Sequence, residues 1–164
     1  MNPNKFLTNG KTKLVKGSIL NPELGNLRLI FVPCSETGQP ASRLHHLLDT
    51  KWKQAKSELK GWYASNVNFK LGSIQTTAVQ SDTWLVHALC TDKSGNTSEK
   101  ALQSCVKKLS DLAKYERGSV HVSMLTVEEN PTLGDLLLTQ CIEKGISVYF
   151  YEPTDKPAQE ELST

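Results

Sequence analysis

The sequence has little of the chemistry that marks metal-binding, disulfide-bonded or membrane proteins. Its four cysteines stand far apart, with no Cys-x-x-Cys pair and no neighbouring histidine cluster. That spacing argues against a zinc site or a disulfide framework and favours small buried thiols. No run approaches the ~18 apolar residues of a membrane span, and the residues after Met1 lack the apolar core of a signal peptide. We therefore expect a cytoplasmic protein with no membrane contact, no metal and no cofactor.

The sequence also lacks a dominant charge, an internal repeat and an internal linker. It has 19 basic and 17 acidic residues, a formal net charge of +2. This balance disfavours nucleic acid as a partner, since such proteins usually carry a basic surface. The 164 residues suit one compact domain. We expect a flexible N-terminus over 1–11, the domain over 12–152 and a disordered polar tail over 153–164.

Strands and helices alternate along the domain. Apolar runs and turn residues predict strands at 13–16, 27–32, 69–79, 83–89, 119–122 and 146–151, and helical periodicity predicts helices at 44–62, 98–114 and 130–144. The longest helix has one apolar face, made by Leu44, Leu48, Trp52, Ala55, Leu59 and Trp62. This interleaving predicts an α/β protein, a three-layer α/β/α domain with a mixed, mostly parallel sheet.

The most informative stretch joins the second strand to the first helix. The continuous apolar run 29–32 is typical of a strand buried on both faces. It leads directly into a small polar loop, 33–40, that contains proline and glycine. In α/β folds, ligands bind where such a loop leaves the carboxyl end of a strand.

Several segments in register with this loop resemble a macro domain, the ADP-ribose-binding fold, and its small bacterial and phosphatase-like branch in particular. The resemblance covers roughly residues 12 to 151. The segments that carry it are Gly17-Ser18-Ile19-Leu20-Asn21-Pro22, 29–36, Gly38-Gln39-Pro40-Ala41-Ser42-Arg43, Leu71-Gly72-Ser73-Ile74-Gln75, Ser119-Val120-His121-Val122 and Gly145-Ile146-Ser147-Val148-Tyr149. It implies the macro-domain fold and ADP-ribose or a related nucleotide as the ligand.

The positions that would contact the ligand depart from the family pattern. Ser18 stands where the family has an adenine-contacting Asp, and Ser35 where it has an Asn on the ribose side. Ala41 and Arg43 replace glycines of the first loop, and the second, diphosphate-binding loop falls on 123–130, which has no glycine. The residues that the resemblance places at the ligand are Ser18, Ile19, Cys34, Ser35, Gly38, Ala41, Arg43, Thr126, Val127, Glu128, Glu129 and Asn130.

These departures have a physical cost. Glycines allow backbone N–H groups to approach a phosphate closely. Arg43 prevents that approach, although its guanidinium can reach a phosphate instead. Glu128 and Glu129 bring negative charge to the diphosphate, and two unit charges ~4 Å apart repel by roughly 4 kcal/mol at an effective dielectric constant of ~20.

Three functions remain open at this point. The first is a non-catalytic module that binds ADP-ribose or a related nucleotide with altered or weakened affinity. The second is a degenerate macro domain that contacts a protein partner and no longer binds ADP-ribose. The third is a weak hydrolase of ADP-ribose derivatives, for which Cys34, Glu36, Glu128 and Glu129 are the candidate nucleophiles or bases. His87 and His121 lie within predicted strands and read as structural histidines.

Overall fold

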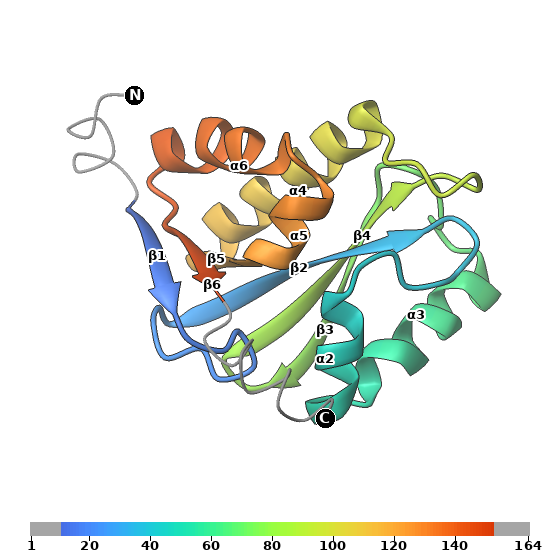
Figure 1. Ribbon diagram of the computed structural model, residues 1–164, viewed down its shortest axis with the longest axis horizontal. Coiled ribbons are helices and arrows are strands. Elements are labelled where there is room, and N and C mark those ends of the chain that lie inside the picture. The colour runs from blue at the N-terminus through green and yellow to red at the C-terminus, as the bar shows by residue number, and fades with distance from the viewer. Residues whose placement is uncertain (1–10, 153–164) are drawn as a thin grey trace, which may run out of the picture.

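The computed structural model describes residues 11–152, which form one six-stranded sheet with helices on both faces (Figure 1). The strand order is β1-β6-β5-β2-β4-β3. The strands are β1 (Thr12–Lys16), β2 (Leu27–Ser35), β3 (Ile74–Gln80), β4 (Thr83–Thr91), β5 (Gly118–Ser123) and β6 (Val148–Glu152). The helices are α2 (Leu44–Lys51), α3 (Gln54–Ser65), α4 (Glu99–Glu116), α5 (Met124–Glu129), α6 (Leu133–Cys141) and the 3-10 turn η1 (Ile142–Lys144).

The sheet is mixed and mostly parallel, as the sequence predicts. The pairs β1–β6, β6–β5, β5–β2 and β2–β4 are parallel, and only the edge strand β3 runs antiparallel, to β4. The carboxyl ends of β2, β4 and β5 therefore lie along one edge of the sheet, and the segments that follow them meet there. The flexible N-terminus and disordered tail that we expect over 1–11 and 153–164 fall, apart from residue 11, outside the described residues.

The central strand β2 is buried on both faces, which explains its continuous apolar run. Leu29 and Phe31 pack with α4 and α6 in one core cluster, whereas Ile30 and Val32 pack with α2 in another. All four side chains are fully buried. The structure thus has the three α/β/α layers, with α4, α5 and α6 on one side of the sheet and α2 and α3 on the other (Figure 1).

The prediction of a single helix over 44–62 is wrong in one respect, because the structure has two helices there, α2 and α3. The break falls at Trp52, whose backbone is extended, with φ −125° and ψ 93°. The Trp52 side chain is buried in the same core cluster as Leu44 and Ala55. The apolar face predicted for the single helix is nevertheless buried along its whole length, through α2, Trp52 and α3.

The largest error concerns 123–130, predicted as a loop. Most of it is the short helix α5, which Ser123 caps by accepting a hydrogen bond from the Leu125 N–H at 3.1 Å. The next helix begins at Leu133 and not at Asn130, as the sequence suggested. Asn130 instead ends α5, where its N–H donates to the carbonyl oxygens of Thr126 and Val127.

The remaining differences lie at the ends of strands. β2 extends to Ser35, three residues beyond the predicted 27–32, and β4 extends to Thr91. The strand predicted over 69–79 begins only at Ile74. The two extended ends pair with each other, Ser35 with Thr91, after a register shift. Both strands therefore deliver polar side chains to the same point of the sheet edge.

Candidate functional site

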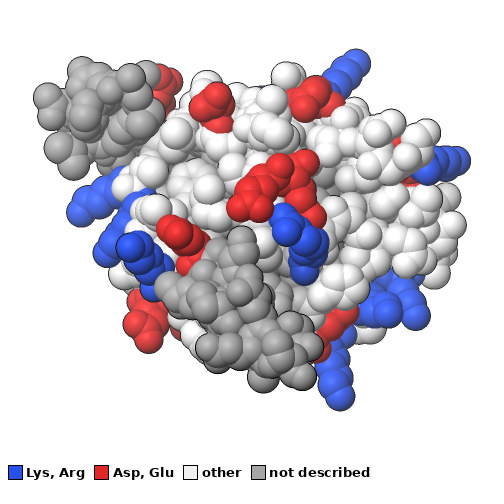
Figure 2. Space-filling view, in the orientation of Figure 1, with Lys and Arg blue, Asp and Glu red and all other residues white. Residues whose placement is uncertain are grey.

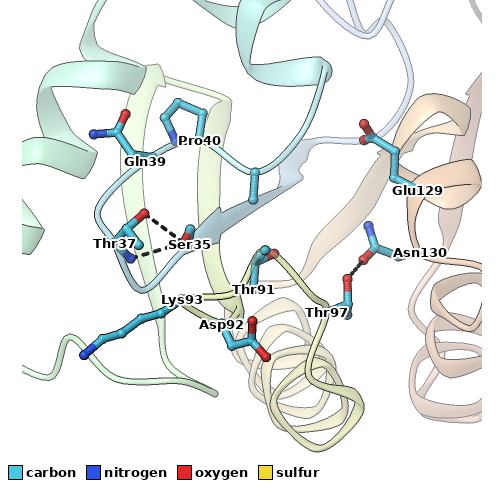
Figure 3. Close-up of a pocket in the computed structure, with 12 residues that line it drawn as sticks. Ser35, Thr37, Gln39, Pro40, Thr91, Asp92, Lys93, Thr97, Glu129 and Asn130 are labelled. Carbon is cyan, nitrogen blue, oxygen red and sulfur yellow. Dashed lines mark hydrogen bonds between the residues drawn. The ribbon is translucent and has the colours of Figure 1, made fainter.

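A polar cavity of about 370 Å³ opens at the carboxyl ends of β2 and β4 (Figure 3). Three segments line it, the loop after β2, the loop after β4 and the end of α5. The lining residues are Ser35, Thr37, Gln39, Pro40, Ala41, Thr91, Asp92, Lys93, Gly95, Thr97, Glu129 and Asn130. Its volume lies at the small end of the usual range for small-molecule sites, roughly 300–1,000 Å³.

The loop after β2 forms one wall and is a tight turn. The Ser35 N–H donates to the Gln39 carbonyl at 2.9 Å, and the Gly38 N–H donates back to the Ser35 carbonyl at 2.9 Å. The Ser35 hydroxyl accepts from the Thr37 N–H and hydroxyl at 3.1 and 2.9 Å. Gly38 has φ +83°, and a Cβ there would lie 2.5 Å from Tyr63 Cγ. The turn and its contact with α3 therefore require glycine at this position.

The loop after β4 forms the facing wall. The Asp92 carboxylate accepts from the N–H groups of Ser94 and Asn96, at 2.9 and 3.0 Å. Glu36, on the opposite wall, accepts from the Lys93 N–H at 2.9 Å and ties the two loops together. The Lys93 side chain points away from the centre of the cavity (Figure 3). Glu36, a candidate base from the sequence, thus holds the two loops together through this contact.

The third wall carries a buried amide. Asn130 Nδ2 donates to the Thr126 carbonyl at 3.1 Å, and Asn130 Oδ1 accepts from the Thr97 hydroxyl at 2.6 Å (Figure 3). These two bonds fix the orientation of the amide and connect α5 to the loop after β4. Half of the twelve residues that line the cavity carry hydroxyl or amide groups, which suits a polar ligand.

Next to this cavity, the loop after β2 and helix α5 are joined by a group of side chains that we call the Arg43 bridge, made of Ser42, Arg43, Thr126, Glu128 and Glu129. Arg43 Nη2 lies 3.1 Å from Glu128 Oε1, and Arg43 Nε lies 3.2 Å from Glu129 Oε2. Ser42 Oγ donates to Glu129 Oε1 at 2.9 Å and lies 3.5 Å from the buried Thr126 Oγ1. Figure 2 shows acidic and basic side chains in contact over α5 and α2.

The bridge changes the electrostatics expected from the sequence. The hydrogen bonds that the Arg43 guanidinium donates to Glu128 and, with a smaller effect, to Glu129 raise the pKa of Arg43 above its ordinary value. Glu128 and Glu129 therefore face a paired cation and do not stand alone beside a diphosphate. Equally, the Arg43 guanidinium already has two carboxylate partners, so a phosphate would have to compete for it.

The predicted adenine end of the site is divided between two cavities. Ser18 lines a wide one of about 410 Å³, with Lys13, Lys16, Asn21 and Glu23 among its other lining residues. Ser18 and Ile19 line a cavity of about 20 Å³, together with Gly17, Leu20, Leu47, Ser123 and Tyr151. Such a volume holds about one water molecule. The Ser18 hydroxyl accepts from the Leu20 N–H at 3.1 Å and thereby closes its own turn.

The structure brings together only part of the predicted site. Ser35, Ala41, Glu129 and Asn130 line the polar cavity. Cys34 is fully buried beneath it among apolar side chains, and burial raises the pKa of its thiol well above the ordinary value. Of the other predicted residues, Gly38 packs under Tyr63, Val127 packs on the core, and Ser18, Ile19, Arg43, Thr126 and Glu128 lie outside the lining of the polar cavity.

Sequence reasoning missed the contribution of the loop after β4. Thr91, Asp92, Gly95 and Thr97 all line the cavity. The signal was present, since Thr91-Asp92-Lys93-Ser94-Gly95-Asn96 is a polar turn directly after an apolar strand. Only the pairing of β4 beside β2 shows that this turn faces the first loop.

The histidines predicted as structural are buried. His87 Nε2 lies 3.2 Å from Nε2 of His45, and burial lowers the pKa of His87 to about 3. His121 is also fully buried. Within residues 11–152, no group of three or more His, Cys, Asp or Glu side chains is arranged to hold a metal ion. None of the helices in that range is long and apolar enough to cross a membrane.

No protein-family model matches the sequence, and no curated protein matches it either. Solved structures do match the fold. A macrodomain protein from Streptomyces coelicolor superposes with a TM-score of 0.78 at 18% identity, over 86% of this chain and 98% of that one. The DarG macrodomain of Thermus aquaticus superposes with a TM-score of 0.69 at 13% identity, over 88% of this chain and 99% of that one. DarTG of Thermosipho africanus, solved in complex with ADP-ribose, gives 0.66 at 16% identity, over 87% of this chain and 42% of that one.

These likenesses extend over most of the chain, but all three identities are below 20%. They match the mixed, mostly parallel α/β/α fold described above. The chain therefore has the macrodomain fold.

Proposed function

We propose that this protein is a non-catalytic binding module for ADP-ribose or a related nucleotide, with an affinity weakened by the Arg43 bridge. The observation that supports it is the polar cavity at the carboxyl ends of β2 and β4, the edge at which α/β folds bind ligands. A structural neighbour with the same fold, DarTG of Thermosipho africanus, was solved with ADP-ribose.

The residues around the cavity support binding more than catalysis. Cys34, one of the candidate nucleophiles, is fully buried, and burial raises the pKa of its thiol well above the ordinary value, which disfavours the reactive thiolate. Glu36 accepts a backbone hydrogen bond, and Glu128 and Glu129 are paired with Arg43. None of these carboxylates stands unpartnered as a general base within the cavity.

The weakened affinity follows from the two ends of the site. At the adenine end, the cavity that Ser18 and Ile19 share has room for about one water molecule, and the wider cavity of about 410 Å³ at Ser18 does not include Ile19 in its lining. Between the two ends, a diphosphate would have to separate Arg43 from two carboxylates before it gained a cation. A ligand held mainly by its ribose end retains only part of the binding free energy.

Calorimetric titration with ADP-ribose at low salt tests the proposal. We expect binding in the high micromolar to millimolar range that is lost in Ala41→Phe, because the larger side chain would fill the polar cavity from its lining. Ala64→Phe is the matched control, since Ala64 is exposed on α3 away from the cavity. The proposal fails if ADP-ribose produces neither heat nor a thermal shift at millimolar concentration. A protein-interaction role would then be the remaining hypothesis.

A further inference from the structure

The two edges of the sheet differ in how they are protected. Within residues 11–152, β1 and β3 are the edge strands, and each pairs with a single neighbour. Natural proteins discourage further pairing at such an edge with lysine or proline, or by covering the strand. β1 carries two exposed lysines, Lys13 and Lys16. β3, with the sequence Ile-Gln-Thr-Thr-Ala-Val-Gln, has no charged residue and no proline. The β3 edge therefore lacks the charge that protects β1.

β3 is also accessible, and it is regular along most of its length. Its Thr76, Ala78 and Gln80 side chains are exposed. The strand pairs with β4 in regular register from Ile74 to Ala78, and a register shift follows between Ala78 and Gln80. Helices α3 and α4 contact β3, but no strand of the described range pairs with its outer side. An unpaired edge presents N–H and C=O groups to which another extended strand can bind.

Two buried polar atoms of β3 have no hydrogen-bond partner in the part of the chain that the structure describes. They are Gln75 Oε1 and Thr77 Oγ1. Because most buried polar atoms in folded proteins are hydrogen-bonded, two such atoms on one strand indicate an environment that the single molecule does not complete. Rotation about the Cα–Cβ bond of Thr77 can direct its hydroxyl toward a strand that approaches the edge.

The sequence of β3 is compatible with antiparallel pairing to a copy of itself. A two-fold axis at Thr77 and perpendicular to the sheet places opposed side chains on the same face. The opposed pairs, all uncharged, are Thr77 with Thr77, Thr76 with Ala78, Gln75 with Val79 and Ile74 with Gln80. Threonine pairs across antiparallel strands form hydrogen bonds. Self-pairing of β1 would instead bring two lysines from each copy into a five-residue ladder, where like charges repel.

We propose that β3 pairs antiparallel with β3 of a second copy of this chain, so that the two sheets join into one continuous sheet about a two-fold axis. A seven-residue edge spans about 23 Å. Pairing over that length gives a small interface, of the class below about 1,200 Å² that forms weak, transient complexes. We therefore expect a dissociation constant on the order of 100 µM.

The inference is independent of the proposed function. The lining of the polar cavity, as described over 11–152, includes no residue of β3. Each copy in the dimer therefore keeps its own cavity.

Sedimentation equilibrium of the full chain tests this inference. At the expected dissociation constant, roughly 15% of the chains should be dimeric at about 10 µM protein and roughly 80% at about 1 mM. The average mass should rise from near that of one chain toward that of two and no further, because a two-fold interface is closed.

Amide NMR of the wild-type protein locates the contact without any variant. Between about 50 µM and about 1 mM protein, the amides of 74–80 should shift and those of 12–16 should not. Concentration-dependent shifts confined to other elements would place the interface elsewhere and overturn the inference.

A matched pair of variants tests the edge itself. Thr76→Lys adds a charge at an exposed position of β3 and should weaken the dimer about tenfold or more. Thr12→Lys makes the same change at an exposed position of β1 and should leave association unchanged. The inference is overturned if the chain remains monomeric at about 1 mM, if the mass grows beyond that of two chains, or if Thr12→Lys weakens association as much as Thr76→Lys.

Discussion

His121 lies in a buried chain of hydrogen bonds whose pH dependence can be measured without any knowledge of the ligand. Its Nε2 lies 2.7 Å from Ser119 Oγ, and its Nδ1 lies 2.7 Å from Tyr151 Oη. The ring stacks on Tyr149 with a centroid separation of 5.0 Å. Burial, and to a smaller extent the positive charge of Arg28, lowers the pKa of His121 from 6.5 to about 3. The folded protein therefore holds this ring neutral.

The sign of the effect follows from linkage. Between pH 6.5 and 3, the unfolded chain binds a proton at His121 that the folded chain does not bind. The free energy of unfolding is therefore not reduced by His121 above pH 6.5, and it decreases as the pH falls from 6.5 to 3. One proton corresponds to about 1.4 kcal/mol per pH unit, so between pH 6 and 5 His121 should remove roughly 1 kcal/mol from the free energy of unfolding. His87, with a pKa of about 3, should remove a similar amount.

Urea unfolding at pH 6 and pH 5 measures this loss, in a range above the titration of most carboxylates. We expect the free energy of unfolding of the wild-type protein to fall by roughly 2 kcal/mol from pH 6 to pH 5. For His121→Gln, the decrease should be smaller by roughly 1 kcal/mol. His46→Gln is the control, because His46 is exposed on α2 and should leave the wild-type slope unchanged.

A second measurement does not depend on the folding of the variant. In NMR spectra of the wild-type protein, the ring signals of His121 and His87 should not titrate between pH 7 and pH 5. A ring signal of either histidine that titrates with a midpoint near pH 6.5 would refute the reasoning. So would the same decrease in the free energy of unfolding from pH 6 to pH 5 for His121→Gln and the wild-type protein.

Three further predictions concern the frame around the site. Gly38→Ala should lower the free energy of unfolding, measured with urea, by more than about 1 kcal/mol. The reason is that Gly38 has φ +83° and a Cβ there would meet the Tyr63 ring. Gly134→Ala is the control, because a Cβ at Gly134 meets nothing within 4 Å. Ser98→Ala should lower the free energy of unfolding by about 1 kcal/mol in the same assay, since the Ser98 hydroxyl caps α4 by accepting a hydrogen bond from the Ala101 N–H. An unchanged urea midpoint would show that the cap does not contribute to stability. A thiol reagent should modify no cysteine of the native protein and all of them in denaturant, since burial raises the pKa of each thiol, and rapid native labelling would contradict this. The cysteines concerned are Cys34, Cys90, Cys105 and Cys141.

The elements that local sequence predicts best are those whose burial is periodic. The strand through 29–32 was recognisable because both of its faces are covered, so every residue is apolar. The predicted apolar face over 44–62 is buried throughout. The sequence could not show that the helix breaks at Trp52, because the apolar spacing continues unchanged across the break.

Prediction was weakest at 123–130, where the expectation of a loop rested on the resemblance. The absence of glycine there is consistent with a helix, and Ser123 is a good N-cap residue. The local signal for α5 was therefore present, but the family pattern outweighed it. The consequence is large, because a helix directs Glu128 and Glu129 toward Arg43, whereas a glycine-rich loop would present its N–H groups to a phosphate.

The sequence by itself determined the class of this protein, the order of most of its strands and helices, and the edge of the sheet at which the polar cavity opens. These follow from apolar periodicity and turn residues, which act over a few neighbouring positions. Only the tertiary structure decided what the site contains. The cavity forms because β4 pairs beside β2, which brings Thr91 to Ser35. The bridge forms because Arg43 and Glu129, 86 positions apart in sequence, meet across the ends of the strands. Such long-range pairings leave no mark on the residues near either partner.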